Sequence, residues 1–438
     1  MSTQQHEKCI TVIDVETTIN SEDSFKANPH DRNNHIVAIG VLKVWKGMGL
    51  KSYDFMHVSE FKCAGYRSWQ PYITEYLYDI LPGTTMLIGQ NIAFDLLYLR
   101  KYMSDKAYTS LVKGMTIWDT QVAEYILSGH NNKFESLDAM SERYGGTLKD
   151  STIKDYWDKN VPTEDIPKDE LLDYLEHDVR NTYKVFRGQI TKLDNFNVSG
   201  TTMNPQNSVP RLQKVLSIAM EHRLATIEMQ WNGMFFDRKA AGEHLAALEI
   251  NVGTYHNETT SYMRGIYAHG LSHFKPEEDI NPMSNTQVKT FLHGGTYSWK
   301  EDRPVYCDGV PVMYKSGSKK GQWKTKKETI HEEWDGLLQC GISNLTHSVD
   351  DAHLKALLRG LNDGTVRAPS PESAKGFIGN ILKLRKYNKD ISTYFKAYSN
   401  VCWPHDSCIH PTYNHAATNT GRLSCTKPNL MNITREGT

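Results

Sequence analysis

The chain has 438 residues, of which 39% are hydrophobic and 23% charged, so it can form two or three domains with cores of their own. Its formal net charge of -1 excludes a uniformly basic nucleic-acid-binding protein. Residues 1–200 nevertheless carry about six net negative charges, and residues 201–438 about five net positive ones. A metal-using domain joined to a nucleic-acid-binding one would show this asymmetry, and so would chance variation.

The cysteines and the terminus indicate the compartment. The seven cysteines are odd in number and include no C-x-x-C pair, which favours reduced thiols. The polar start "MSTQQHEK" is not followed by the apolar core of a signal peptide, and no run approaches the roughly 18 apolar residues of a membrane span. We therefore expect a cytoplasmic protein with no membrane partner.

The first half of the chain predicts an α/β domain. Residues 9–18, 34–45 and 51–58 are short runs rich in β-branched residues, predicted to form an antiparallel meander. Residues 84–90 predict a fourth strand, a helix follows over 92–103, and helical periodicity dominates from 118 to 187. This order suits an α/β core of the ribonuclease-H type, which we assign to residues 1–195.

The second half is mostly helical. A polar, unpatterned stretch at 196–210 predicts a linker, and a helix is expected over 211–230. A turn, a short extended piece and a long helix follow within 232–267. Residues 296–333 predict a β-hairpin insertion with a basic loop, "YKSGSKKGQWKTKKE", which is either a phosphate-contacting loop or a solvated hairpin tip. Residues 373–401 predict another long helix.

Four carboxylates and a tyrosine form the first candidate site. Asp14 and Glu16 are two residues apart on the first predicted strand, so both project from one face. Such a pair repels unless a cation lies between the two groups. Asp95 follows the fourth strand, and Tyr174 and Asp178 are one turn apart on a helix. Each residue alone has an ordinary structural explanation. That acidic residues occur on the first strand, after a later strand and on a late helix, each within an apolar stretch, is hard to obtain by chance.

The chemistry explains why these groups would gather. Hydrolysis of a phosphodiester needs an activated water and a stabilised leaving oxygen, and two Mg²⁺ ions about 4 Å apart supply both. Hard cations bind oxygen ligands, chiefly carboxylates and water. Four carboxylates can hold two ions, and a tyrosine hydroxyl can orient the attacking water.

The segments "VIDVETT", "GQNIAFD" and "YLEHD" resemble the three motifs of the DEDD proofreading exonucleases, in the branch that carries a tyrosine. "IWDTQVAEYIL" is similar to the same domain of family A DNA polymerases. The resemblance implies 3′→5′ exonuclease activity with two Mg²⁺ ions, for which Mn²⁺ substitutes. It implies that Asp14, Glu16 and Asp178 hold one ion and that Asp14 and Asp95 hold the other. Tyr174 and Glu16 would position the water, and Thr17, Asn91 and Phe94 would lie near the 3′ end of the cut strand.

The carboxy-terminal segment "TNTGRLSCTKPNLMNI" resembles the family A segment that lies beside the primer terminus. The resemblance implies that Arg422 reaches the minor groove, where acceptor atoms are similar for every base pair. Thr420, Asn429 and Asn432 match the same segment and would also contact DNA. Cys425 replaces a serine and Met431 a glutamine, so the template contact of that amide is in doubt.

Three further segments resemble the family's palm and thumb. "EMQWNGMFFD" matches the palm-to-thumb turn, "NPMSNTQVKTFL" a thumb helix start and "LRKYNKDISTYF" the returning helix. The resemblance implies the start of the palm at 211–238, the thumb at 239–400 and a partial palm at 401–438. Arg385 and Lys389 are spaced i, i+4 and can meet the phosphates of one strand, although a solvated helix face has the same pattern. "CWPHDSCIH" is spaced too tightly for a usual zinc finger.

The family's palm aspartates and fingers helix have no counterpart after Arg422. We therefore expect the amino-terminal part of a compact, phage-like family A polymerase, in the cytoplasm of a bacterium or of a phage-infected host. Polymerisation would need a carboxy-terminal polypeptide, and a split polymerase, an interrupted gene and a truncated sequence stay open. The alternatives are a stand-alone 3′→5′ exonuclease with a DNA-clamping half and a non-catalytic DNA-binding subunit. Expected partners are primer–template DNA, a single-stranded 3′ end and, by analogy, a processivity factor.

Overall fold

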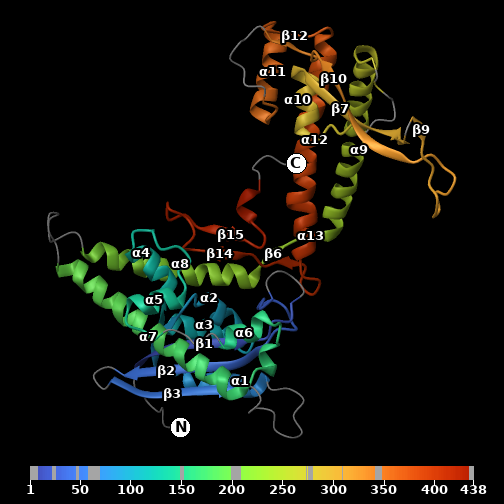
Figure 1. Cartoon of the computed structure of the whole chain (residues 1–438). Helices are drawn as coiled ribbons and strands as arrows, with labels where there is room; N and C mark the ends of the chain where they lie inside the picture. The colour runs from blue at the N-terminus through green and yellow to red at the C-terminus, as the bar shows by residue number, and fades with distance from the viewer. Residues whose placement is uncertain are drawn as a thin grey trace. The chain divides into compact units, whose positions relative to one another are not determined.

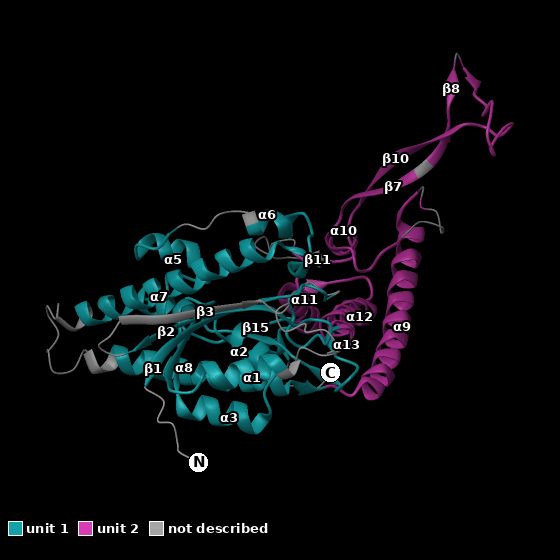
Figure 2. Ribbon diagram, turned by 90° about the horizontal axis from the view of Figure 1, so that it is seen from below, with its two compact units in different colours: residues 1–235, 401–433 teal, residues 236–400, 434–438 magenta. Residues whose placement is uncertain are grey.

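The computed structural model describes residues 8–21, 26–45, 49–57, 70–147, 152–198, 209–272, 274, 280–307, 309–340 and 348–433. Most of the predicted linker at 196–210 and the last five residues of the chain lie outside the described residues. Figure 2 colours two compact units, unit 1 with residues 1–235 and 401–433 and unit 2 with residues 236–400 and 434–438. Unit 2 covers nearly the range predicted for the thumb, and its identity as a thumb stays a prediction.

A five-stranded sheet organises unit 1, in the order β3-β2-β1-β4-β5. Its first three strands are antiparallel, and β4 and β5 add in parallel to β1. The strands are β1 (Cys9–Thr17), β2 (Ile36–Trp45), β3 (Gly49–His57), β4 (Thr84–Gly89) and β5 (Thr116–Asp119). The predicted meander and the fourth strand are thus confirmed. The structure is a mixed α/β fold.

Helices cover this sheet (Figure 1). The helices of unit 1 are α1 (Gln70–Ile80), α2 (Ala93–Arg100), α3 (Asp105–Gly114), α4 (Thr120–Leu127), α5 (Leu137–Arg143), α6 (Thr152–Asp158), α7 (Lys168–Val198) and α8 (Val209–Asn232), with the 3-10 helices η2 (Thr163–Asp165) and η4 (Leu430–Asn432). α7 crosses β2 and β1. Ile73 of α1 and Leu96 of α2 join Val12 and Ile39 of the sheet in one apolar core.

One prediction in this half is wrong. Helical periodicity was expected from Trp118 onward, whereas Trp118 lies in β5, and the helix α4 begins at Thr120. Asp119 ends the strand and caps the helix, because its carboxylate accepts the backbone N–H groups of Gln121 and Val122. A strand of four residues is too short for alternation to be recognised against the helical pattern that follows it.

The residues after 400 return to unit 1. They form β13 (Cys408–Ile409), which pairs with β6 (Met234–Phe235), and the hairpin of β14 (Thr412–Asn414) and β15 (Ser424–Thr426). Ile409, Tyr413 and Cys425 are buried there. The extended piece predicted after residue 232 is β6.

Unit 2 is mostly helical, as expected. Its helices are α9 (Arg238–Gly270), α10 (Asn285–His293), α11 (Asp351–Asp363), α12 (Pro371–Asp390) and the π-helix η3 (Ile391–Lys396), and α13 (Ala397–Val401) ends at the unit boundary. The predicted helix over 373–401 therefore contains a π-helical turn. An aromatic core holds the unit together: Tyr267 lies 5.2 Å from Phe291 and 4.5 Å from Tyr297, between ring centroids.

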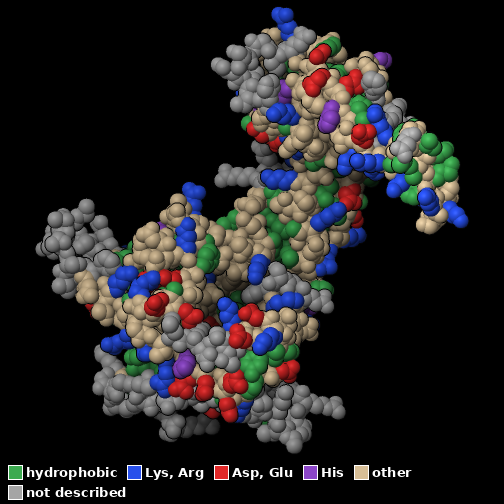
Figure 3. Space-filling model, in the orientation of Figure 1, with side chains coloured by type: hydrophobic (Ala, Val, Ile, Leu, Met, Phe, Trp, Pro, Cys, Tyr) green, Lys and Arg blue, Asp and Glu red, His purple; other side chains and the backbone are tan. Residues whose placement is uncertain are grey.

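The predicted hairpin insertion is confirmed. Its long strands are β7 (Gly295–Pro304) and β10 (Thr325–Trp334), which are antiparallel, and its short ones are β8 (Tyr306–Cys307) and β9 (Val310–Pro311); β11 (Gln339–Cys340) pairs with β12 (Val366–Arg367) outside it. The six lysines of the basic loop are exposed, and Figure 3 shows Lys and Arg side chains in blue along this arm. Within the described part of the chain, no helix is long and apolar enough to cross a membrane.

Candidate metal site and nucleic-acid interface

The carboxylates of β1 lie on one face of the strand, as their spacing predicts. Asp14 is paired in register with Gly40 of β2 and Glu16 with Ala38, and a bulge follows Glu16. Both carboxylates are half-buried, while Val15 between them is buried on the other face. The strand therefore presents two acidic groups at its carboxyl end.

Helix α7 brings a third carboxylate to this pair. It can approach β2 because Gly40 has no side chain: a Cβ there would lie 2.8 Å from Leu175 Cγ and 2.9 Å from Val179 Cγ2. Asp178 is the residue before Val179 on the same helix. Carboxylate oxygens of Asp14, Glu16 and Asp178 all lie within 4.8 Å of one another.

Asp95 joins the group from the first turn of α2. Its Oδ1 accepts the backbone N–H of Val15 at 3.1 Å, which ties it to β1 between Asp14 and Glu16. Asp95 is 1% exposed. Burial, and after it the negative charge of Asp14, raise the pKa of Asp95 well above its ordinary value. The structure thus brings all four predicted acids to one end of β1.

Tyr174 lies one turn before Asp178 on α7. Its half-buried ring packs edge-on against Trp157 of α6, with centroids 5.8 Å apart and planes at 89°. This contact limits the rotation of the Tyr174 ring.

These residues fit a hard divalent cation. The three clustered groups offer only carboxylate oxygens, which Mg²⁺ and Mn²⁺ prefer. A cation would relieve the repulsion from Asp14, which adds to burial in raising the pKa of Asp95. Among the described residues, no other set of three or more His, Cys, Asp or Glu side chains comes this close, so Cys402, His405, Cys408 and His410 do not assemble a zinc site.

Asn91, predicted to lie near the cut end, is held by a buried network. It adopts a left-handed backbone conformation with φ of 52°, which asparagine tolerates. Its backbone N–H donates to Asp119 Oδ1 at 3.2 Å, and its side-chain oxygen accepts from Arg223 of α8. Arg223 also donates to Asp119 Oδ2 and to the carbonyl of Tyr413, both at 3.0 Å. The sequence analysis did not identify Arg223 or Asp119 as site residues. The signal available for Arg223 was a charged side chain among the apolar residues of α8.

The other two residues predicted near the cut end differ in exposure. Thr17 is buried, whereas the half-buried ring of Phe94 packs at an angle on Tyr98, 5.0 Å between centroids. The partly exposed ring of Phe94 can therefore contact a ligand, whereas the buried Thr17 supports the structure around the site.

The predicted primer-terminus segment docks on helix α4 and the loop after it. Thr418 to Arg422 form a turn, in which Thr418 Oγ1 donates to the Arg422 carbonyl at 2.9 Å. The Tyr125 hydroxyl donates to the Thr418 carbonyl, and His130 stacks on Tyr125 at 4.5 Å. Gly421 has φ of 70°, and a Cβ there would lie 3.1 Å from His130.

The side chains predicted to contact DNA are exposed on this segment: Thr420, Arg422, Asn429 and Asn432. Asn429 caps η4 by accepting the backbone N–H of Met431 at 3.0 Å.

The two residues of unit 2 that are predicted to contact DNA, Arg385 and Lys389, differ in their surroundings. Arg385 donates to the Val349 carbonyl and to Asn285 Oδ1 and pairs with Asp351, whereas Lys389 is exposed.

Comparison with known proteins identifies relatives. The profile of DNA polymerase family A matches residues 365–438. A segment of 53 residues, 12% of this chain, is 45% identical to DNA polymerase I of Bacillus subtilis (strain 168), of which it covers 6%. The chain is related to family A DNA polymerases.

The fold agrees with this relation. The solved structure described as the POL domain of Pol1 from M. smegmatis, in complex with DNA primer-template and dNTP, matches 98% of this chain with a TM-score of 0.54. The two sequences are 14% identical, so the likeness concerns the fold. This chain covers 53% of that structure's chain, about half its length.

Proposed function

We propose that this protein is a metal-dependent 3′→5′ DNA exonuclease within a family A polymerase frame. The observation that carries the proposal is the meeting of Asp14, Glu16 and Asp178 within 4.8 Å, with Asp95 buried beside Asp14. The resemblance of the surrounding motifs to the proofreading exonucleases supplies the direction of cleavage and the DNA substrate.

The four carboxylates would hold two divalent cations, Mg²⁺ or Mn²⁺. When bound, the ions activate water and stabilise the leaving oxygen. Tyr174 and Glu16 would orient the attacking water, and the packing of Tyr174 on Trp157 supports a fixed hydroxyl. Phe94 would stack on a terminal base, and Asn91 would contact the terminal nucleotide in the position that Arg223 and Asp119 impose.

The carboxy-terminal turn would bind the primer end. The exposed side chains of Thr420, Arg422, Asn429 and Asn432 support this role, and so does the family match over 365–438. Lys389 is exposed enough to contact phosphate. Arg385 would have to leave Val349 and Asn285 to do the same.

The test is primer degradation. A 5′-labelled primer with an unpaired 3′ end is annealed to a template and incubated with Mg²⁺, with and without dNTPs. The wild-type protein should shorten the primer from its 3′ end. Asp14→Ala/Glu16→Ala should reduce the rate by more than about 100-fold, since losing even outer partners of metal ligands costs 10–100-fold. Lengthening with dNTPs reports nucleotide addition separately.

Two further variants separate chemistry from folding. Asp173→Asn removes an exposed acid next to Tyr174 and should keep wild-type activity. Tyr174→Phe keeps the ring on Trp157 and should lower the rate by about 10-fold or more through loss of the hydroxyl. Equal rates for the wild type and for Asp14→Ala/Glu16→Ala would refute the assignment, and DNA binding without any cleavage would favour the non-catalytic alternative.

A further inference from the structure

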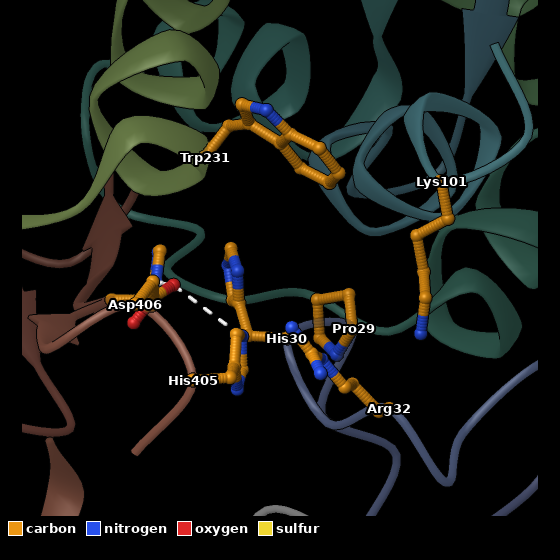
Figure 4. A pocket seen from close by; sticks show the side chains of 8 residues that line it. Pro29, His30, Arg32, Lys101, Trp231, His405 and Asp406 are labelled. Atoms are coloured by element: carbon orange, nitrogen blue, oxygen red, sulfur yellow. Dashed lines mark hydrogen bonds and ion pairs between the residues drawn. The ribbon is translucent and has the colours of Figure 1, made fainter. Parts of the chain in front are cut away.

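Unit 1 contains a pocket outside the carboxylate cluster, with a volume of about 540 Å³. Four chain segments line it: the loop after β1, the residue that follows α2, the end of α8 and the stretch on both sides of β13. Figure 4 shows their side chains around one opening. We call it the cationic pocket, defined by His30, Arg32, Lys101, Trp231, His405 and His410.

Backbone carbonyls hold the Lys101 side chain in place. Its Nζ donates to the carbonyls of Asp31 at 2.9 Å and Asn34 at 2.6 Å, which uses two of its three N–H donors. Burial lowers the pKa of Lys101 to about 8, so its charge is poorly solvated there. Arg32 lies in the same loop and is exposed. The pocket therefore presents one cation that backbone carbonyls hold in place, Lys101, and one exposed cation, Arg32.

Histidines form the opposite wall. The rings of His30 and His410 stack 3.9 Å apart, and His410 Nδ1 donates to the Gln230 carbonyl at 2.7 Å. Asp406 accepts from His410 Nε2 at 3.0 Å and lies 3.4 Å from His405 Nε2. Burial and the nearby His410, Lys101 and His405 lower the pKa of His30 well below its ordinary value. The charges of Lys101 and Arg32 attract an anion and repel a metal cation, and the Asp406 carboxylate is paired with His410 and His405.

Trp231 adds a flat apolar surface beside these histidines, Arg32 and Lys101. The Arg100 guanidinium lies over its ring, 4.9 Å from the centroid, and His30 is 6.2 Å away. Within the pocket, an aromatic plane in the same cavity as the charges of Arg32 and Lys101 matches a base next to a phosphate. The volume lies within the usual range for small-ligand pockets.

We propose that the cationic pocket binds one nucleotide unit, with its phosphate between Arg32, Lys101 and His30 and its base against Trp231. The nucleotide comes either from a single DNA strand or from free mononucleotide, and in naming these sources the inference rests on the proposed exonuclease function. Binding itself needs neither the carboxylates nor a metal ion.

The test is equilibrium binding in EDTA with the Asp14→Ala/Glu16→Ala protein, so that metal-dependent binding at the carboxylate site is removed. The probes are dAMP, deoxyadenosine, inorganic phosphate and an eight-residue oligo-dT. We expect dAMP, oligo-dT or both to bind, and Arg32→Gln to weaken that binding by about 10-fold. Trp231→Phe should weaken dAMP binding but not phosphate binding. The exposed Lys113 of α3 supplies the control, Lys113→Gln, with unchanged binding.

Each outcome has a meaning. Binding of dAMP indicates a free mononucleotide site, and binding of oligo-dT alone indicates a strand site. Phosphate binding as tightly as dAMP, with no effect of Trp231→Phe, would overturn the nucleotide assignment. Binding unchanged by both Arg32→Gln and His405→Gln would overturn the pocket. If the protein binds dAMP but does not degrade the primer, the proposed exonuclease function is wrong, while the proposal of a nucleotide site in this pocket stands.

Discussion

At the scale of single residues, Arg223 connects distant parts of unit 1. It is 4% exposed and contacts a strand end through Asp119, a predicted site residue through Asn91, and the returning carboxy-terminal segment through Tyr413. Its buried ion pair with Asp119 is satisfied by further hydrogen bonds, which is the condition for such a pair to be tolerated. Arg223 thus sets the position of Asn91 from a helix outside the segments that resemble exonuclease motifs.

His415 is the residue for which we predict a pH effect. Thr226 Oγ1 donates to the Arg223 carbonyl at 2.9 Å, so it accepts from His415 Nε2 at 2.8 Å. Burial, and then the charges of Arg223 and His222, lower the pKa of His415 to about 3. The unfolded chain takes up this proton below about pH 6.5, so stability is full above that pH and falls as the pH drops towards 3.

When the pH falls from 7 to 5, proton uptake by His415 in the unfolded chain should lower the free energy of unfolding by up to about 2 kcal/mol. Solvent screening of the partly exposed ring makes the effect smaller than this limit. His415→Gln keeps a donor for Thr226 and should flatten this dependence in urea unfolding measured at both pH values. The exposed His269 of α9 provides the control, His269→Gln, which should behave as wild type. Equal losses for wild type and His415→Gln would contradict the prediction.

At the scale of elements, the approach of α7 to β2 decides whether the acids meet. The contact depends on Gly40, whose missing Cβ admits Leu175 and Val179. Asp178 lies between these two apolar residues on the helix, and Gly40 is paired with Asp14. One small residue on a neighbouring strand therefore controls the distance between carboxylates that are 164 positions apart, from 14 to 178.

Gly40→Ala should test this contact. The added Cβ is too close to Leu175 and Val179, so α7 must shift, at a cost of about 1–3 kcal/mol in the free energy of unfolding. Exonuclease activity should fall further than in Asp173→Asn, because Asp178 moves with the helix. Gly114→Ala at the end of α3, where a Cβ meets open space, should leave both stability and activity nearly unchanged. Normal primer degradation by Gly40→Ala would show that the close approach is dispensable.

At the scale of the whole molecule, unit 1 is built from two separate stretches of chain. Residues 401–433 return to it after unit 2 and bury Ile409, Tyr413, Ala416 and Cys425 there. The segment predicted to hold the primer end is consequently part of the same compact unit as the candidate nuclease site. Its turn rests on Tyr125 and His130 of that unit.

A chain ending at Asn400 should therefore lose stability in unit 1. Five buried apolar side chains, those of Cys402, Ile409, Tyr413, Ala416 and Cys425, disappear together with the Tyr413 contact to Arg223. This should lower the free energy of unfolding by on the order of 5 kcal/mol. Protease cleavage within residues 8–235 should become faster. Arg422→Ala, which changes an exposed side chain, should weaken primer binding and leave unfolding within about 0.5 kcal/mol of wild type. Unchanged protease resistance of the shortened chain would contradict the prediction.

Local patterns were sufficient for several features. The two-residue alternation placed Asp14 and Glu16 on one strand face, and the four-residue spacing placed Tyr174 and Asp178 on one helix. The first four strands and the hairpin of β7 and β10 were also predictable, because backbone periodicity and turn residues act over a few neighbouring positions. The short β5 was missed for the same reason, since Thr116–Asp119 is too brief to show a period.

The sequence by itself thus determined the residue types, the faces on which they lie and the order of the elements. Only the tertiary structure decided which faces meet: Asp178 with Asp14 across Gly40, Asn91 with Arg223, and the carboxy-terminal turn with Tyr125. The cationic pocket likewise arises from four segments that no local pattern connects. The physical reason is that packing depends on complementary shapes and charges between distant segments, whereas periodicity reports the geometry of one segment alone.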